Sequence, residues 1–288
     1  MNKKKEIRGD VAAFDKNWEV RKESTYTHFT TDLPKNQIQF AFRNHWEVIS
    51  SFLESSSFNG GKRVLEVGCG RGSLSAYFAN NGYDCTLLDK SGKVIDIAKE
   101  SFYKLGLESE FIVGDVNNLP FEEETFDLIT SIGLLEHFED IKKPIEEQVR
   151  VLSKGGVFTA YVVPEYKNNI QKDYNWINKI LRHYSKSFQK QEIAKESLYR
   201  SDDDSKKYIR IMEDLGLKNI FSSGIYSVPM ISHSIDFPFS LMPDRAEEEI
   251  VLHFNNLLKK RKLKYPNQHP WLCKEGNGQA FIICGYKE

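Results

Sequence analysis

The chain has 288 residues, of which 40% are hydrophobic and 28% charged, and this is enough to bury a sizeable core. A net charge of −1 gives no global basic field, so we expect no nucleic-acid partner. The four cysteines lack the spacing of a metal site, and no apolar stretch approaches the roughly 20 residues of a membrane span. We therefore expect a cytoplasmic protein with reduced cysteines, no metal site and no membrane contact.

The first periodic segment lies within an aromatic-rich region at 10–58. Apolar residues recur there at helical spacing, namely Phe42, Trp46, Ile49 and Leu53. This pattern predicts a helix whose apolar face packs against the rest of the fold. His45 lies inside this helix and is expected to have a surface or packing role.

A short apolar strand at 63–67 runs into three alternating glycines at 68–72, and a helix begins near Ser73. A helix N-terminus carries unpaired N–H groups and a partial positive charge, and glycines let a ligand approach the backbone, so this turn predicts a small polar ligand. A dinucleotide is one alternative, but its fingerprint needs glycine or alanine at the position of Ser73. Glu66, just before the turn, is a further difference.

Strands and helices then alternate along the chain, which predicts an α/β fold. The apolar strand segments are 63–67, 85–88, 110–113, 127–131 and 156–163. The helical segments between them are 71–80, 91–105 and 140–153. A further helix at 203–215 and two apolar runs, 217–223 and 280–286, complete the set and could supply two more strands.

Polar residues stand at or just after the ends of three of these strands. Asp89 follows Gly68 by 21 residues, and an acid at this spacing can accept the protons of both hydroxyl groups of a ribose. NAD sites share this feature. Asp115 and Val116 follow the strand at 110–113, and Ser131 lies at the end of the strand at 127–131.

Two more segments complete the pattern. The fourth strand leads into Leu134-Leu135-Glu136-His137, and the last helix of the alternation runs into Val149-Arg150-Val151-Leu152-Ser153-Lys154-Gly155-Gly156. The pattern thus has five segments, at 64–72, 82–89, 111–121, 126–137 and 149–156. In order and spacing they resemble the motifs of class I S-adenosylmethionine-dependent methyltransferases. The resemblance covers about residues 60–163 well and the part from 203 onward in outline.

The resemblance implies a Rossmann-like, seven-stranded, mostly parallel sheet with helices on both faces. It also implies S-adenosylmethionine as cofactor and S-adenosylhomocysteine as product. The cofactor-binding residues that it implies are Glu66, Gly68, Gly70, Asp89, Lys90, Asp115, Val116 and Ser131. Glu66 is expected to meet donors near the methionine end, Asp89 the ribose and Asp115 the adenine. Asp127 is expected to have a structural role only.

Candidate catalytic residues are His137, with Glu136 as its competitor, and Tyr26. Related small-molecule methyltransferases often fold an N-terminal segment over the cofactor, so the resemblance implies an N-terminal helical lid at 1–58 that contains Tyr26 and His28. The remaining residues, 59–288, would form the methyltransferase domain. A general base is needed only where the acceptor has to lose a proton, and the sequence does not choose between these cases.

Two insertions depart from the common core, after the fifth and sixth strands, at 164–201 and 224–278. Each could cap an acceptor pocket, and the second could instead form a homodimer interface. The second insertion contains a helix at 244–262 with a basic end, which is expected to be solvated.

We expect a small-molecule methyl acceptor that reacts at nitrogen, oxygen or an activated carbon. An RNA or protein acceptor is the alternative, weakened by the chain charge and by Ser131-Ile132-Gly133-Leu134, which stands where some such enzymes carry an asparagine-proline-proline-tyrosine motif. An NAD-linked oxidoreductase and a non-catalytic cofactor-binding subunit are the remaining alternatives.

Overall fold

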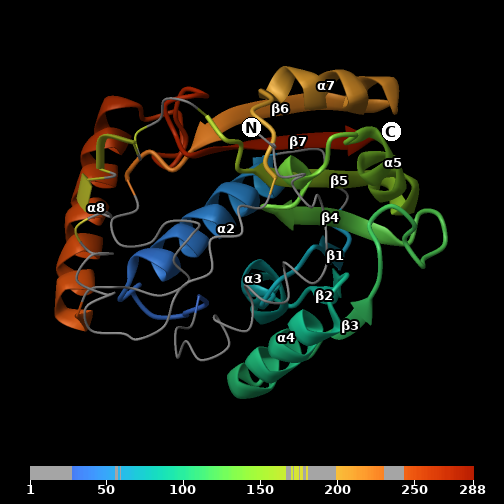
Figure 1. The fold of residues 1–288 in the computed structure, drawn as a ribbon, viewed down its shortest axis with the longest axis horizontal. Helices are drawn as coiled ribbons and strands as arrows, with labels where there is room; N and C mark the ends of the chain where they lie inside the picture. The colour runs from blue at the N-terminus through green and yellow to red at the C-terminus, as the bar shows by residue number, and fades with distance from the viewer. Residues whose placement is uncertain are drawn as a thin grey trace, which may run out of the picture.

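A computed structural model describes residues 28–55, 58, 60–166, 170, 172–174, 176–177, 180, 199–229 and 243–288. In these residues seven strands form one sheet in the order β3-β2-β1-β4-β5-β7-β6 (Figure 1). The strands are β1 (Arg63–Val67), β2 (Asp84–Asp89), β3 (Glu110–Val113), β4 (Phe126–Ile132), β5 (Leu152–Val162), β6 (Leu217–Ile225) and β7 (Ala280–Lys287). Only β7 runs antiparallel to its neighbours, so the expected mostly parallel sheet is confirmed.

The central strands are apolar because both of their faces are covered. Val64 of β1 and Leu128 of β4 belong to one core, and Leu65 and Ile129 belong to the other. Adjacent residues of a strand point to opposite faces, so a near-continuous apolar run fills both cores. The sequence pattern at 63–67 and 127–131 follows directly from this burial.

Helices cover both faces of the sheet (Figure 1). They are α2 (Gln37–Ser55), α3 (Ser73–Asn80), α4 (Gly92–Leu105), α5 (Lys142–Val151), α7 (Ser205–Asp214) and α8 (Asp244–Lys264), with a short 3₁₀ helix, η1 (Leu135–His137), after β4. Apolar residues of α2, α3, α4 and α8 share the first core, and those of α5 and α7 share the second. This arrangement confirms the Rossmann-like layering.

One boundary differs from expectation, because β5 begins at Leu152 and not at 156. Leu152 pairs with Phe126 of β4, and the register then shifts before Leu128 pairs with Val157. Gly155, with φ +72°, lies in the intervening segment. The helix that the sequence predicts as far as 153 therefore ends at Val151, because pairing with β4 outweighs the continuing helical pattern.

The second insertion packs against the same core as the sheet. Helix α8 contacts α2, and Trp271, after α8, is fully buried. Gly224 forms an isolated bridge with Cys273, so both ends of the insertion meet beside β6. Residues 1–27 and most of 167–198 lie outside the described residues, so the lid and the first cap stay predictions. Within the described part of the chain, no helix has the length and apolarity needed to cross a bilayer.

Candidate functional site

The turn after β1 is fastened to the end of β2. The N–H groups of Gly68 and Cys69 both donate to the carbonyl of Leu88, at 2.8 and 3.1 Å. The N–H of Gly70 donates to Oδ2 of Asp89 at 3.2 Å. These three amides are thus used within the protein and do not form an open cradle for a pyrophosphate. The turn instead presents the Asp89 carboxylate at the edge of the sheet.

Two glycines of the turn have conformations that other residues rarely adopt. Gly68 has φ +66° and Gly70 has φ +54°. A Cβ on Gly68 would lie 2.8 Å from Cδ1 of Leu134, in the loop after β4. Gly68 is therefore required both by its dihedral angle and by the packing of that loop, which lies against the turn.

The Asp89 carboxylate accepts backbone hydrogen bonds from both sides of the sheet edge. Its Oδ2 accepts from Gly70, and its Oδ1 accepts from the N–H of Ser91 at 3.0 Å. A carboxylate can accept about four hydrogen bonds, and the hydroxyl groups of a ribose are donors that such a group accepts. The residue is partly exposed at the end of β2. This chemistry fits the two hydroxyl groups of a ribose.

Lys90 and Asp115 join the ends of β2 and β3. Their side chains form an ion pair, with Nζ and Oδ2 2.9 Å apart. Asn117 donates to Oδ1 of Asp115 from its backbone and its side chain, both at 2.9 Å. Burial opposes ionisation of Asp115, but the hydrogen bonds from Asn117 and Lys90 outweigh it and lower its pKa. Val116, the next residue, is buried. Asp115 is therefore an ionised acceptor that is already positioned.

Glu66 is buried on β1, with 3% of its surface exposed. Its Oε2 accepts from the N–H of Ser75 at 2.9 Å and from the Ser75 hydroxyl at 2.5 Å. Glu66 thus meets one backbone and one side-chain donor, and its expected place near the methionine end of the cofactor stays a prediction. Burial raises its pKa to about 7, although both bonds from Ser75 favour the charged form. The carboxyl group thus ties β1 to the first turns of α3.

Ser131, near the end of β4, carries a buried hydroxyl group without a partner. Its side chain is fully buried, and its Oγ makes no hydrogen bond in the structure. An unsatisfied buried polar atom costs about 1–3 kcal/mol, so such a group calls for a ligand or an ordered water. Together with the Asp89 carboxylate, this hydroxyl shows that the residues at this edge suit a polar nucleoside ligand.

His137 and Glu136 lie in η1, directly after β4. The Nδ1–H of His137 donates to the carbonyl of Tyr199 at 2.7 Å, and burial lowers the pKa of His137 to about 4, so it is neutral near pH 7. Glu136 is 1% exposed, and burial raises its pKa to about 7. Its Oε2 has no hydrogen-bond partner in the structure, while its Oε1 lies 4.0 Å from Nε2 of His137.

A chain of hydrogen bonds joins Trp271, His45 and Tyr226, and it is not evident from the sequence. Trp271 Nε1–H donates to Nδ1 of His45 at 3.2 Å, which places the His45 proton on Nε2. This Nε2–H donates to the hydroxyl oxygen of Tyr226 at 2.9 Å. Burial lowers the pKa of His45 to about 3, so the imidazole is neutral. The hydroxyl proton of Tyr226 thus points to some other acceptor.

Tyr226 follows β6 directly, and β6 runs parallel to β4 and β5, so Tyr226 lies at the same edge of the sheet as Glu136. Burial raises the pKa of Tyr226, and the Glu136 carboxylate adds to this increase. Tyr226 has φ +62°, a conformation that is strained for a residue with a side chain. No local pattern could have identified it, because its partners His45 and Trp271 lie far away in sequence.

Two other residues complete the account of the predicted site. Asp127 accepts from Arg63 through both carboxylate oxygens, at 2.7 and 3.0 Å, and is located at the start of β4, away from the ligand edge. Its structural role agrees with expectation. Tyr26 lies outside the described residues, and its proposed role stays a prediction.

Comparisons with known proteins bear on the fold and the family. Residues 65–160, about a third of the chain, match a family model described as a methyltransferase domain. The chain contains a class I methyltransferase domain. It is 34% identical over 105 residues to a ubiquinone biosynthesis O-methyltransferase of Coxiella burnetii, which covers 36% of this chain and 45% of that one. It is 28% identical over 113 residues to YcgJ of Bacillus subtilis, named as an uncharacterized methyltransferase, with 39% and 45% covered.

Solved structures of the methyltransferase fold match over longer stretches. The crystal structure of YcgJ has a TM-score of 0.50 at 19% identity, covering 85% of this chain and 98% of that one. The [4+2]-cyclase SpnF has a TM-score of 0.54 at 16% identity, covering 96% and 94%. At these identities the structures show the fold alone. The chain spans less than half the length of the two sequence relatives, so the match with them is confined to the methyltransferase domain.

Proposed function

We propose that this chain transfers a methyl group from S-adenosylmethionine to nitrogen, oxygen or an activated carbon of a small molecule. The observation that carries the proposal is the hydrogen bond from Gly70 to Asp89, which joins the glycine turn to the acid at the end of β2. This bond consumes an amide that a pyrophosphate would need and presents a carboxylate suited to a ribose. The antiparallel β7 between β5 and β6 also differs from the strand order of dinucleotide-binding folds.

The residues around this bond would hold the cofactor. Asp89 would accept the ribose hydroxyl protons, and Asp115 would accept from the adenine amino group. Lys90 would keep Asp115 ionised and in place, with Val116 packing beside it. Glu66 would fix the first turns of α3 under the methionine end, where Ser131 offers its unpaired hydroxyl. A sulfonium methyl group is already activated for in-line displacement, so the protein's main tasks are alignment and exclusion of water.

Glu136 and His137 would act on the acceptor as a pair. A general base works best when its pKa is close to the working pH, and Glu136, at about 7, meets this condition. Its unpaired Oε2 could accept a proton from an acceptor hydroxyl or amine. His137, held by Tyr199, would orient the acceptor or line the cofactor site as a neutral group. Tyr226 could donate a hydrogen bond from its hydroxyl group to the same methyl-acceptor molecule.

Two observations favour a small-molecule acceptor. The Coxiella burnetii relative is named for ubiquinone biosynthesis, in which the methylated molecule is small, and the near-zero charge of this chain offers no field for RNA. The insertion that includes α8 and Trp271 packs close to Tyr226 at the edge of the sheet, where it could enclose such a molecule. An RNA or protein methyltransferase, or a non-catalytic S-adenosylmethionine-binding subunit, is the alternative.

Calorimetric titration with S-adenosylhomocysteine, with NAD run alongside, tests the proposal. Micromolar binding of S-adenosylhomocysteine alone would support it. Binding of NAD instead, or of neither compound, would contradict it. Product detection with S-adenosylmethionine and a panel of small-molecule acceptors then tests turnover. This second step is necessary because SpnF, which shares the fold, is described as a cyclase. Tight binding without any turnover would indicate a non-catalytic or different role.

A further inference from the structure

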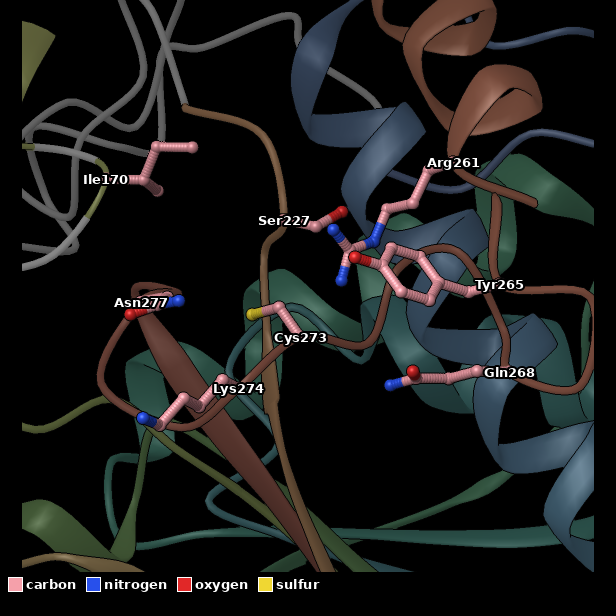
Figure 2. Close-up of a pocket in the computed structure, with 8 residues that line it drawn as sticks. All are labelled: Ile170, Ser227, Arg261, Tyr265, Gln268, Cys273, Lys274 and Asn277. Atoms are coloured by element: carbon pink, nitrogen blue, oxygen red, sulfur yellow. The ribbon is translucent and has the colours of Figure 1, made fainter. Parts of the chain in front are cut away.

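A cavity of about 410 Å³ lies beside the C-terminal end of α8 and the segment that leads from α8 to β7 (Figure 2). The described residues that line it are Ile170, Ser227, Arg261, Tyr265, Gln268, Cys273, Lys274 and Asn277. None of these eight residues is acidic, whereas Arg261 and Lys274 are cationic. The volume lies within the range of small-molecule sites, and the lining residues are distinct from those proposed for the cofactor and the acceptor.

Arg261 is held in place by the protein. Its Nη2 donates to the carbonyl of Leu272 at 2.8 Å, and its guanidinium carbon lies 5.2 Å from the centre of the Tyr265 ring. A guanidinium group has five N–H donors, so the bond to Leu272 leaves several of them for a ligand. In Figure 2 this guanidinium group and the Tyr265 hydroxyl point toward the same part of the cavity.

Lys274 and Asn277 line the opposite side of the cavity from Arg261 (Figure 2). Among the described residues, neither Arg261 nor Lys274 forms an ion pair with a carboxylate. The nearest acid in sequence, Glu275, accepts hydrogen bonds from Ser205 and Tyr166 elsewhere. Two cations thus line one cavity without a counterion from the described residues.

The remaining polar groups add donors. The side-chain amides of Gln268 and Asn277 and the Tyr265 hydroxyl can each donate a hydrogen bond. The Ser227 hydroxyl donates to the carbonyl of Pro270 at 2.9 Å and contributes no donor of its own. A cavity with cations and neutral donors, and without acids, is complementary to a negatively charged group.

We propose that this cavity binds the phosphate or carboxylate group of a small molecule, with Arg261 as the principal donor and Lys274 as a second cation. The planar fork of Arg261 suits two oxygens of either group. Other lysines of the same helix, such as Lys260, do not line the cavity. The inference goes beyond the proposed methyl transfer and does not depend on it.

Calorimetric titration of the full chain with inorganic phosphate, and separately with succinate, tests the site in a low-salt buffer. The protein is saturated with S-adenosylhomocysteine in one series and free of it in another, so that binding in the cofactor site is recognised. We expect saturable binding of one anion per chain in both series. Arg261→Gln should weaken this binding at least fivefold, because glutamine can still donate to Leu272 but lacks the charge.

Lys274→Gln should weaken binding by a smaller factor. It tests the site independently, because this exposed residue forms no side-chain hydrogen bond with the described residues. Lys260→Gln removes the same charge outside the cavity and should leave the affinity unchanged. Absence of saturable binding of both anions, or equal affinity in the Arg261→Gln, Lys274→Gln and Lys260→Gln variants, would overturn the proposal. Titrations with S-adenosylhomocysteine test the methyltransferase proposal separately. A failure of the anion-site proposal can therefore be distinguished from a failure of the methyltransferase proposal.

Discussion

The carboxylate of Glu66 accepts hydrogen bonds from both the backbone N–H and the hydroxyl group of Ser75, at 2.9 and 2.5 Å. These bonds join the last part of β1 to α3 across the glycine turn. The carboxyl group is buried, and burial raises its pKa to about 7 from an ordinary value of 4.5. The same residue therefore fastens the turn and makes the stability of the fold depend on pH.

Glu66→Gln should remove this pH dependence. A raised pKa means that the folded chain binds more protons than the unfolded chain between pH 4.5 and about 7, so wild-type stability falls as the pH rises through this window. Glutamine still offers Ser75 an acceptor but does not ionise. Relative to wild type, the variant should gain up to about 3 kcal/mol of unfolding free energy on going from below pH 4.5 to above pH 7, measured by urea unfolding. Exposed Glu146→Gln is the control, and parallel pH profiles for wild type and Glu66→Gln would contradict the prediction.

Asp89→Ala should weaken binding of S-adenosylhomocysteine by roughly 1–3 kcal/mol, the range for losing hydrogen bonds to a charged group. The variant removes the ribose acceptor and also frees the N–H of Gly70. Calorimetric dissociation constants provide the measurement. Asp84→Ala, at the exposed opposite end of β2, makes the same chemical change away from the site and should bind normally. An unchanged constant for Asp89→Ala would remove Asp89 from the site.

The sequence predicts the sheet because its information there is local. Apolar runs such as 127–131, punctuated by glycine turns and amphipathic helices, have one consistent interpretation as alternating strands and helices. The shared location of Asp89, at the end of β2, and Asp115, after β3, is predictable for the same reason, since parallel strands bring their carboxyl ends to one edge. The start of β5 at Leu152 was less predictable, because it depends on pairing with Phe126 of a neighbouring strand.

The acceptor side could not be predicted in the same way. His45, Tyr226 and Trp271 come from α2, the end of β6 and the segment after α8, and their hydrogen bonds span 181 and 226 positions. The helical pattern around His45 indicates only packing or exposure. It does not indicate that the Trp271 indole donates to His45 and fixes the tautomer of its imidazole. Polar networks between distant segments depend on how insertions pack, and one sequence does not encode that packing in any short pattern.

Asp127→Asn should destabilise the fold without changing cofactor binding. Its side chain is only 9% exposed and receives two hydrogen bonds from the Arg63 guanidinium and one from the Arg63 backbone. Arg63 is half exposed, so solvent screening limits the loss to about 1–2 kcal/mol of unfolding free energy. Thermal unfolding and S-adenosylhomocysteine titration measure the two effects side by side. A large loss of affinity in a stably folded variant would place Asp127 in the site after all.

Glu136→Gln should reduce turnover strongly while leaving S-adenosylhomocysteine affinity nearly unchanged. If Glu136 takes a proton from the methyl-acceptor molecule, its ionised carboxylate is the active form. The wild-type rate should then rise with pH through about 7 and level off above it. The variant should lose this rise. His137→Ala keeps the carboxyl group and should lower the rate while retaining a rise with pH. The measurement is the rate of S-adenosylhomocysteine formation from pH 5 to 9 with an acceptor identified by product detection. Identical pH profiles for wild type and Glu136→Gln would show that the carboxylate takes no proton in the rate-limiting step.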